Sequence, residues 1–277
     1  MNKDRLVSAT IMILVSFFAV LNKWVFIAVL LALTIGGLYE FFYLIKKKGI
    51  PIYSYTGIFL GVLIPLSIFF QFELTKKLEL FLIVLVLLLI FLLQLSRKEN
   101  TNAIVGISTT LFGVLYVSWF FSFLIKIRFL LPGVAGVKLV GFILLITKCG
   151  DIGALLIGSR FGKHPLLARI SPNKTIEGSI GSFTFSALTA LLARCLLPVE
   201  LSFSTAHILL IGIFFGGIGQ LGDMSESLIK RDCNVKDSGK FLPALGGALD
   251  AIDSLLFSSP VFYFYMLHAL DVVRNGV

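Results

Sequence analysis

Charged residues are scarce in this chain. They make up 14% of its 277 residues, against 57% hydrophobic residues, and the mean hydropathy is +0.99. A soluble globular domain has about 25% charged and ~45–50% apolar residues, so the composition excludes that class and predicts an integral membrane protein. Cysteine is scarce as well, and Cys149, Cys195 and Cys233 have no spacing typical of a metal or redox pair. We interpret the three cysteines as having no part in the chemistry.

Long apolar segments predict the fold. Runs of about 17–25 apolar residues are typical of membrane-spanning helices. Nine such segments predict an all-α, polytopic integral membrane protein: 6–21, 24–45, 52–71, 78–96, 103–125, 137–158, 177–197, 206–228 and 249–270. The first segment lacks a small-residue cleavage site and leads directly into the second, so we interpret it as structure and not as a signal peptide.

The basic residues predict an orientation. If the amino terminus is cytoplasmic and all nine segments cross, fifteen of the 24 Lys and Arg residues face the cytoplasm and eight face the other side, with Lys148 inside a segment. This bias follows the positive-inside rule and places loops 159–176 and 229–248 on one cytoplasmic face. The same loops explain the net charge of +9, and neither resembles a nucleic-acid-binding module, so we expect no nucleic-acid partner.

Acidic residues divide the chain in character. Five precede residue 140 and ten follow it, although no internal repeat and no Pro- or Ser-rich linker separates the halves. We interpret residues 1–140 as a scaffold of transmembrane helices and residues 141–277, with both cytoplasmic loops, as the catalytic region.

The densest run of charge lies between the last two apolar segments. Charged groups beside lipid are costly, so such a run indicates a functional site. Carboxylates suit a hard metal ion, lysine and arginine suit phosphate, and glycines let the backbone approach a ligand. The run therefore predicts phosphoryl chemistry, and it comprises Ser227, Lys230, Arg231, Lys236, Asp237, Ser238, Gly239, Gly246, Gly247, Asp250 and Asp253.

Helical spacing groups several of these side chains. Asp223, Glu226, Ser227 and Lys230 lie at i, i+3, i+4 and i+7 and share one helical face. An ion pair of Glu226 with Lys230 could simply secure the helix end, but that reading leaves Asp223 unpaired, which favours a metal.

The next segment offers two further carboxylates. Asp250 and Asp253 share a face at i, i+3, so two helices could supply oxygen ligands to one Mg²⁺, although Asp253 could instead be a helix-start carboxylate favoured by the dipole. Gly246 and Gly247 precede this helix and suit backbone approach to phosphate. The glycines of segment 206–228 more often indicate close helix packing.

A second constellation lies upstream. It begins at Asp151 and includes Lys163 and His164, but its glycine spacing is not that of a Walker A loop. The run Ser171-Pro-Asn-Lys174-Thr175-Ile-Glu177 predicts a helix start, with Thr175 or Ser171 as the cap and Glu177 early in the helix. We favour phosphate as the partner of Lys174.

Together these motifs resemble the phosphatidate cytidylyltransferases, also called CDP-diacylglycerol synthases. The pattern of that family is Ser-x-apolar-Lys-Arg, four residues, Lys-Asp-x-Gly-x-x-apolar-Pro-x-His-Gly-Gly-x-x-Asp-Arg-x-Asp. The resemblance covers roughly residues 147–260 and includes Phe161-Gly-Lys-His-Pro-Leu and Ser171-Pro-Asn-Lys-Thr-Ile-Glu-Gly. Two departures are Leu245 at the position of the His and Ala251 at that of the Arg.

The resemblance implies an enzyme of phospholipid biosynthesis that joins CTP and phosphatidate, with Mg²⁺, and releases CDP-diacylglycerol and pyrophosphate. It implies Asp223 and Asp250 as metal ligands, with Asp253 as an alternate or supporting ligand. Lys230, Arg231 and Lys236 would neutralise lipid phosphate or pyrophosphate, and Ser171, Lys174 and Thr175 would bind nucleotide. Further substrate-binding residues would be Asp151, Glu177, Asp237, Gly246 and Gly247. A homodimer in the cell inner membrane, with its site facing the cytoplasm, is also implied.

Three alternatives belong to other classes. A CDP-alcohol phosphotransferase is rejected because Asp250 and Asp253 have the wrong spacing for its motif and its Ala-Arg is missing. A CTP-dependent polyprenol kinase shares the nucleotide but not the Lys-Asp-x-Gly and Gly-Gly run. A catalytically impaired paralogue or a transporter is the non-enzyme reading, motivated by Leu245 and Ala251.

Overall fold

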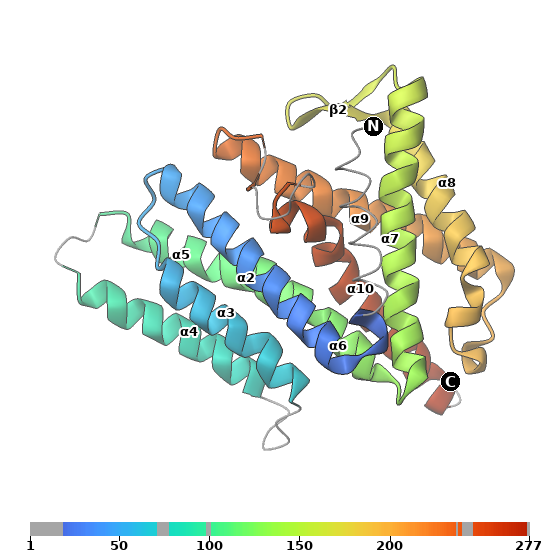
Figure 1. Cartoon of the computed structure of the whole chain (residues 1–277), viewed down its shortest axis with the longest axis horizontal. Coiled ribbons are helices and arrows are strands. Elements are labelled where there is room, and N and C mark those ends of the chain that lie inside the picture. The colour runs from blue at the N-terminus through green and yellow to red at the C-terminus, as the bar shows by residue number, and fades with distance from the viewer. Residues whose placement is uncertain (1–18, 71–77, 98–100, 237, 240–245, 276–277) are drawn as a thin grey trace. The chain divides into compact units, whose positions relative to one another are not determined.

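The protein is almost entirely helical (Figure 1). The computed structural model describes residues 19–70, 78–97, 101–236, 238–239 and 246–275. These residues form two compact units. The first unit comprises the described residues up to Ile125 with those of Asp232–Ile252, and the second comprises Lys126–Arg231 with the described residues from Asp253 onward.

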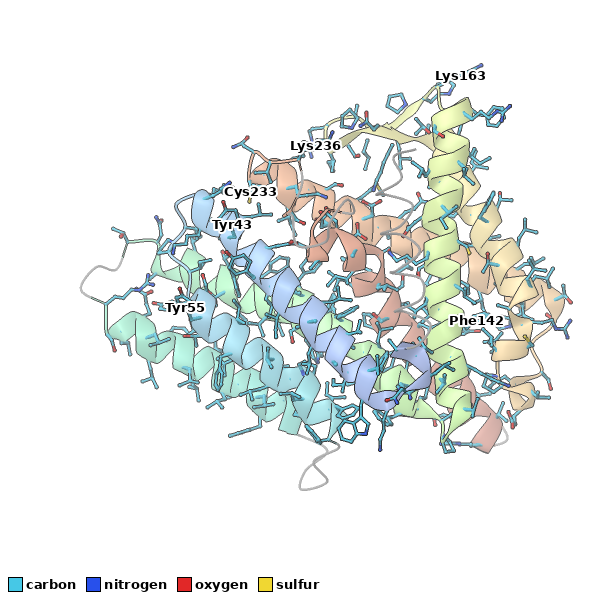
Figure 2. All side chains as sticks on the ribbon, viewed as in Figure 1. Tyr43, Tyr55, Phe142, Lys163, Cys233 and Lys236 are labelled. Atoms are coloured by element: carbon cyan, nitrogen blue, oxygen red, sulfur yellow. The ribbon has the colours of Figure 1, made fainter. Side chains whose placement is uncertain are left out.

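The first unit is built from the amino-terminal helices: α2 (Lys23–Lys47), α3 (Ser54–Phe69), α4 (Leu78–Leu95), α5 (Ala103–Gly113) and the π-helical η1 (Val114–Trp119). It also contains the first part of α6 (Phe120–Leu130), whose remainder belongs to the second unit. Asn22 caps α2, because its side chain accepts the N–H groups of Trp24 and Val25. The fully buried rings of Phe41 and Phe42 lie at the centre of this unit. Exposed aromatic residues, including Tyr43 and Tyr55, lie on the outside (Figure 2).

The second unit contains α7 (Val134–Phe161), a hairpin of β1 (Pro165–Leu167) and β2 (Ser171–Thr175), α8 (Ile176–Leu192), the 3₁₀ turns η2 (Arg194–Leu196) and η3 (Val199–Leu201), and most of α9 (Thr205–Asp232) and α10 (Ala248–Asn275). Phe142, Phe215 and Phe262 are fully buried, and the Phe262 ring centroid lies 6.0 Å from that of Phe142 and 5.3 Å from that of Phe215. Phe142 is labelled in Figure 2.

The small sheet was not expected from the sequence. Its strands are antiparallel, with Pro165 opposite Thr175 and Leu167 opposite Ser171, beside the end of α7 and the start of α8 (Figure 1). Pro172 accounts for the strand, because a proline pushes the preceding residue into an extended conformation. Ser171 therefore lies in β2 and does not cap a helix. The Thr175 hydroxyl accepts the Gly178 N–H at 3.1 Å, which confirms Thr175 as the cap of α8.

The apolar segments predicted from 24–45 onward all coincide with helices. Among the described residues, five helices are long and apolar enough to cross a membrane: Lys23–Lys47, Ala103–Leu130, Val134–Phe161, Thr205–Asp232 and Ala248–Arg274. The polytopic all-α membrane class is thus confirmed. Most of the predicted first segment, 6–21, lies outside the described residues. The division of labour between residues 1–140 and 141–277 stays a prediction.

Candidate functional site

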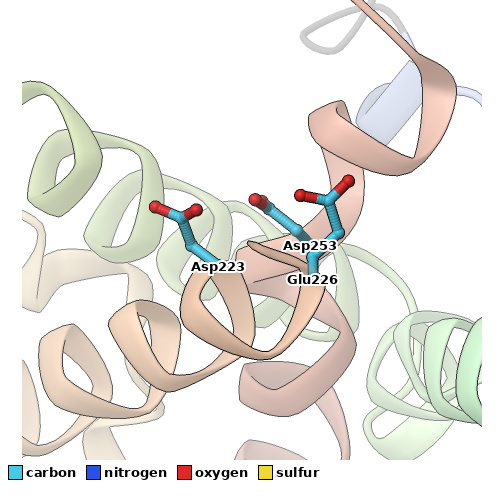
Figure 3. Close-up of side chains that lie close together, drawn as sticks. All are labelled: Asp223, Glu226 and Asp253. Carbon is cyan, nitrogen blue, oxygen red and sulfur yellow. The ribbon is translucent and has the colours of Figure 1, made fainter. Parts of the chain in front are cut away.

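Three carboxylates meet in the second unit and form what we call the carboxylate cluster. Asp223 and Glu226 come from successive turns of α9, and Asp253 comes from α10 (Figure 3). Each contributes one oxygen, and these oxygens all lie within 4.8 Å of one another. Glu226 is fully buried and Asp253 is only 7% exposed. Such closely spaced carboxylates repel one another when ionised, so positive charge nearby stabilises the cluster.

Two lysines supply positive charge to the cluster. The Lys174 Nζ, at the end of β2, lies 2.6 Å from Oδ2 of Asp223, and Lys230 pairs with Glu226 one turn along α9. The ion pair of Glu226 with Lys230, expected from their i, i+4 spacing, is confirmed. The expectation that this pair would leave Asp223 without a partner is wrong, because Lys174 pairs with it. The cluster thus has three carboxylates and two lysines in direct contact with them.

Small residues let α9 pack closely against both α10 and α8. A Cβ at Gly222, next to Asp223, would lie 2.4 Å from the backbone oxygen of Asp253. A Cβ at Gly212 would lie 2.5 Å from Cα of Ala187 in α8. Real Cβ atoms do not approach so closely, so both positions require glycine. The prediction that these glycines serve helix packing is confirmed.

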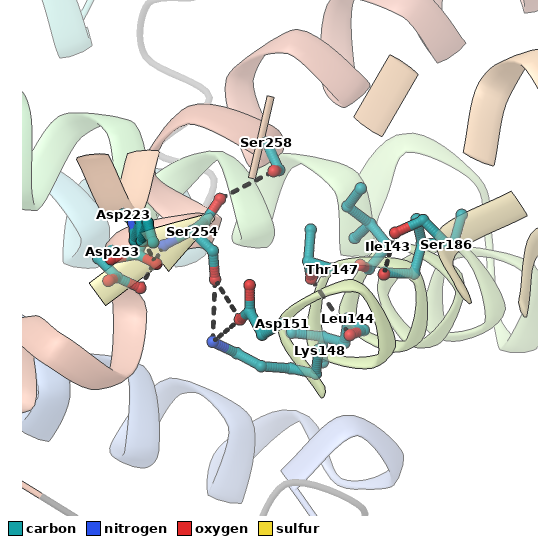
Figure 4. Close-up of polar contacts among 12 residues, drawn as sticks. Ile143, Leu144, Thr147, Lys148, Asp151, Ser186, Asp223, Asp253, Ser254 and Ser258 are labelled. Carbon is teal, nitrogen blue, oxygen red and sulfur yellow. Dashed lines mark hydrogen bonds and ion pairs between the residues drawn. The ribbon is translucent and has the colours of Figure 1, made fainter. Parts of the chain in front are cut away.

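Beside the cluster, Lys148, Asp151 and Ser254 form a closed triangle of polar contacts (Figure 4). The Lys148 Nζ lies 3.1 Å from Oδ2 of Asp151 and donates to the Ser254 hydroxyl at 2.9 Å, while that hydroxyl donates to Asp151 at 3.1 Å. Sequence reasoning proposed Asp151 but missed its partners. The i, i+3 spacing of Lys148 and Asp151 inside an apolar segment was the available signal for one of them.

Glu177 holds the base of the β1–β2 hairpin. Its Oε2 accepts the N–H groups of Lys163 and His164 at 3.1 and 3.2 Å, and its Oε1 lies 2.6 Å from Nδ1 of His164. These hydrogen bonds, that of the His164 ring foremost, lower the pKa of Glu177 to about 2. On α9, Arg231 donates from Nε to the backbone oxygen of Ile170 at 3.2 Å. The hairpin that presents Lys174 is therefore fixed at two points.

In the first unit, Asp250 belongs to a separate network. Its Oδ2 accepts the Ser238 hydroxyl at 2.8 Å and the Gly247 N–H at 2.7 Å. Gly246 has a φ of 100°, a conformation that favours glycine. The network also includes Glu40 of α2, which sequence reasoning did not assign, because nothing in the spacing links residue 40 to residues 238–250.

The structure brings some predicted residues together and leaves others apart. Asp223 and Asp253 meet in the carboxylate cluster together with Lys174 and Lys230, and Glu226 joins them as a residue the metal prediction had omitted. Asp250 belongs to the other unit, and its role as a ligand of the same Mg²⁺ stays a prediction. Lys236 is exposed (Figure 2). Asp237 and Leu245 lie outside the described residues.

Nearly the whole chain is similar to proteins named phosphatidate cytidylyltransferase. The phosphatidate cytidylyltransferase of Synechocystis sp. is 32% identical over an aligned length of 300 positions. The alignment covers 99% of this chain and 100% of that protein. The phosphatidate cytidylyltransferase of Bacillus subtilis is 31% identical over 268 residues, or 95% of this chain and 97% of that protein. That of Staphylococcus epidermidis is 43% identical over 126 residues, or 46% and 48% of the two chains.

The family comparison gives the same result. Residues 3–269 match the model of the Cytidylyltransferase family. The match includes the carboxylate cluster, both of its lysines, the β1–β2 hairpin and the Asp250 network. The chain therefore belongs to the cytidylyltransferase family.

Proposed function

We propose that this membrane protein transfers the cytidylyl group of CTP to phosphatidate, which gives CDP-diacylglycerol and pyrophosphate. The observation that carries the proposal is the carboxylate cluster with its two lysines, found in a chain that is similar over nearly its full length to two phosphatidate cytidylyltransferases. Carboxylates that can hold a hard cation, beside ammonium groups that can hold phosphates, are what a reaction between two polyanions needs.

The reaction requires no nucleophile from the protein. An oxygen of the phosphatidate phosphomonoester attacks the α-phosphorus of CTP, a new P–O bond forms, and the bond between the α-phosphorus and the bridging oxygen breaks, so that its electron pair leaves with pyrophosphate. Catalysis is then mostly positioning and neutralisation of charge. In our proposal Lys174, with Ser171 and Thr175, holds the nucleotide. Lys230, Arg231 and Lys236 neutralise the lipid phosphate or the pyrophosphate.

The carboxylate cluster suits Mg²⁺. Its donors are carboxylate oxygens, which this hard cation prefers, and its three carboxylates outnumber the two lysines that pair with them. Within the described part of the chain, Asp253 is buried and forms no direct ion pair. We propose Asp223, Asp253 and Glu226 as metal-holding residues, and we retain Asp250 as a predicted ligand. When bound, Mg²⁺ would supply charge neutralisation to the CTP phosphates.

The remaining predicted substrate contacts fall into two groups. Asp151 and Glu177 are engaged within the protein, by Lys148 and by the base of the hairpin, and we propose that they act on substrates through these neighbours. Gly246 and Gly247 lie just before α10, where backbone N–H groups favour phosphate. Asp237 is kept as a substrate contact on the sequence resemblance alone.

We further propose that the protein lies in the cell inner membrane as a homodimer, with loops 159–176 and 229–248 on the cytoplasmic side. The excess of basic residues on that side supports this orientation. A cysteine placed at position 163 in a cysteine-free background should react with an impermeant thiol reagent only from the cytoplasm. Reaction from the opposite side would contradict the orientation. Light scattering of the purified protein, corrected for detergent, tests the dimer.

Labelled CTP tests the activity and separates it from the kinase alternative. Purified protein in phosphatidate-containing micelles with Mg²⁺ should transfer ³²P from [α-³²P]CTP into lipid and release label from [γ-³²P]CTP only as pyrophosphate. Transfer of the γ-label into a lipid would indicate a CTP-dependent kinase and contradict the proposal. Absence of both products from a folded protein would favour the impaired paralogue.

A further inference from the structure

The amino terminus of α10 lacks a capping side chain of its own. The helix begins at Ala248, so the residue in the capping position is Gly247, which has no side-chain oxygen. The first N–H groups of a helix have no partner within the helix, and a Ser, Thr, Asp or Asn at this position usually satisfies one of them. Because Asp250 lies in the first turn of this helix, the way these groups are satisfied bears on the orientation of a predicted catalytic carboxylate.

Glu40 of α2 supplies the missing acceptor. It is 4% exposed, and its Oε2 accepts the N–H of Leu249 at 3.0 Å. Asp250, the third helical residue, accepts the N–H of Gly247 at 2.7 Å, which is the reciprocal half of a capping box. Glu40 thus acts as the capping residue from a position 209 residues away in the sequence. Its negative charge is also favourable at the positive end of the helix dipole.

Ser238 links the two carboxylates. Its hydroxyl lies 3.1 Å from Oε2 of Glu40 and 2.8 Å from Oδ2 of Asp250. A hydroxyl has one proton, so it donates to one carboxylate at a time and holds the two oxygens at a fixed separation. Ser238 is 1% exposed. The orientation of Asp250 is therefore set by Ser238 and by the helix start, both of which Glu40 holds in place.

Two glycines make room for the Glu40 side chain. A Cβ at Gly239 would lie 2.2, 2.5 and 2.8 Å from Oε1, Cδ and Cγ of Glu40, which are its three nearest atoms. A Cβ at Gly247 would lie 2.0 Å from the Ser238 hydroxyl oxygen and 2.3 Å from Oε2 of Glu40. Both glycines belong to the motif that the sequence shares with its family. Close contact with Glu40 explains why both positions are glycine, in addition to the predicted approach of the backbone to phosphate.

We propose that Glu40 is a positioning residue for nucleotidyl transfer: it caps α10 from α2 and thereby fixes Ser238 and Asp250. The inference rests on the proposed function for the importance of Asp250. The geometry itself does not depend on that function. In this way α2, which lies in the predicted scaffold region 1–140, takes a direct part in building the site.

A double-mutant cycle tests the contact. Gly239→Ala should lower kcat at least about tenfold in the unmodified protein, because the new methyl group strikes the Glu40 carboxylate. In a Glu40→Ala background all three clashing atoms are gone, so Gly239→Ala should change kcat less than about twofold further. Equal effects of Gly239→Ala in both backgrounds would overturn the inference. If Glu40→Ala does not fold, Glu40→Ser, which loses the Cδ and Oε1 atoms nearest to the new methyl group, replaces it, and again equal effects would overturn the inference.

The role of Glu40 is read from kinetics and from hydrogen exchange. Glu40→Ala should lower kcat by about 10–100-fold with little change in the KM for CTP, and Glu40→Gln, which keeps an acceptor, should restore most of it. The Leu249 amide should exchange faster in Glu40→Ala than in Glu40→Gln. Thr34→Val is the matched control, because Thr34 is also buried in α2 and its hydroxyl has no partner among the described residues.

These readouts separate two kinds of failure. If the unmodified protein turns over no CTP, the proposed function fails, and the exchange of the Leu249 amide alone decides the inference. If the unmodified protein is active but Glu40→Ala retains its full kcat or leaves the Leu249 amide protected, Glu40 is not a positioning residue. A loss of kcat in Thr34→Val as large as that in Glu40→Ala would also contradict the proposal, because it would indicate a general requirement for a packed α2.

Discussion

Several buried or partly buried carboxylates are stabilised differently in the two units. In the second unit Asp223, Glu226 and Asp151 each pair with a lysine. In the first unit Glu40 and Asp250 accept backbone N–H groups and the hydroxyl of Ser238. Among the described residues Glu40 forms no ion pair. A lysine on a flexible stem can be exchanged for another cation, whereas a backbone N–H cannot move away.

This difference predicts different roles for the same side-chain type. Carboxylates that are paired with lysines can take up a metal ion while the lysines turn to a phosphate. Carboxylates held by the backbone keep a fixed geometry and organise the chain around them. On this view the second unit provides exchangeable charge for the reaction, and the first unit provides a rigid frame for Asp250.

Removing one charge from the carboxylate cluster should have the largest effect. Asp223→Asn keeps the shape of the side chain but loses a proposed metal-holding charge, and it should lower turnover at saturating Mg²⁺ by at least about 100-fold. Initial rates with [α-³²P]CTP measure the loss. Asp232→Asn is the matched control, because Asp232 is also on α9 but pairs with Lys48 at the surface. Comparable turnover in Asp223→Asn and the unmodified protein would refute the role of the cluster.

The spacing of the cluster should depend on Gly222. In Gly222→Ala the new methyl group would lie 2.4 Å from the backbone oxygen of Asp253, so α9 and α10 must separate at this level. We expect the free energy of unfolding to fall by about 1–3 kcal/mol, with a loss of turnover. In Gly217→Ala the new Cβ would lie 3.3 Å from Cε1 of the Phe183 ring, which can move slightly. The free energy of unfolding and the turnover of this variant should therefore change little. Thermal unfolding in detergent compares the two variants, and equal stability would contradict the close packing at Gly222.

Exchange of lysine for metal can be observed directly. Lys174→Met removes the ammonium group that lies 2.6 Å from Oδ2 of Asp223, so Mn²⁺, used as a probe for Mg²⁺, should bind the nucleotide-free protein about tenfold more tightly. The same variant should show a higher KM for CTP. Electron paramagnetic resonance of free Mn²⁺ gives the affinity without catalysis. Lys163→Met is the control, because Lys163 is exposed in the neighbouring loop. Weaker Mn²⁺ binding in Lys174→Met would show that the lysine supports the metal site and does not compete for it.

Much of the fold was predictable, because length and composition decide where a chain crosses a membrane. Apolar runs located the helices from residue 24 onward, and the i, i+4 spacing identified the pairing of Glu226 with Lys230. The hairpin was missed because Pro172 was read as part of a helix start, although a proline favours an extended residue before it.

Within the site, the contacts that sequence could not supply join distant segments. Lys174 and Asp223 are 49 residues apart, and Glu40 and Leu249 are 209 apart. Helical periodicity states only which residues share a face of one helix, so it cannot select a partner on another. A buried glutamate in an apolar segment was a signal that Glu40 has a partner. It gave no indication that the partner is the first turn of α10.

Glu177 is an intermediate case, since it accepts both backbone N–H groups and the His164 ring. Its pKa is lowered from 4.5 to about 2, so its contribution to stability is full above pH 4.5 and is lost only as the pH falls through about 2. The carboxylate is therefore charged throughout pH 5–8.

Glu177→Gln should lower kcat/KM by about two- to fivefold, because the partners of Glu177 are near the surface. The loss should be the same at every pH between 5 and 8. Glu200→Gln, at an exposed glutamate in the 3₁₀ turn η3, should have no effect. A change in the shape of the pH profile in Glu177→Gln would show instead that Glu177 titrates during the reaction, and would group it with the exchangeable charges of the cluster.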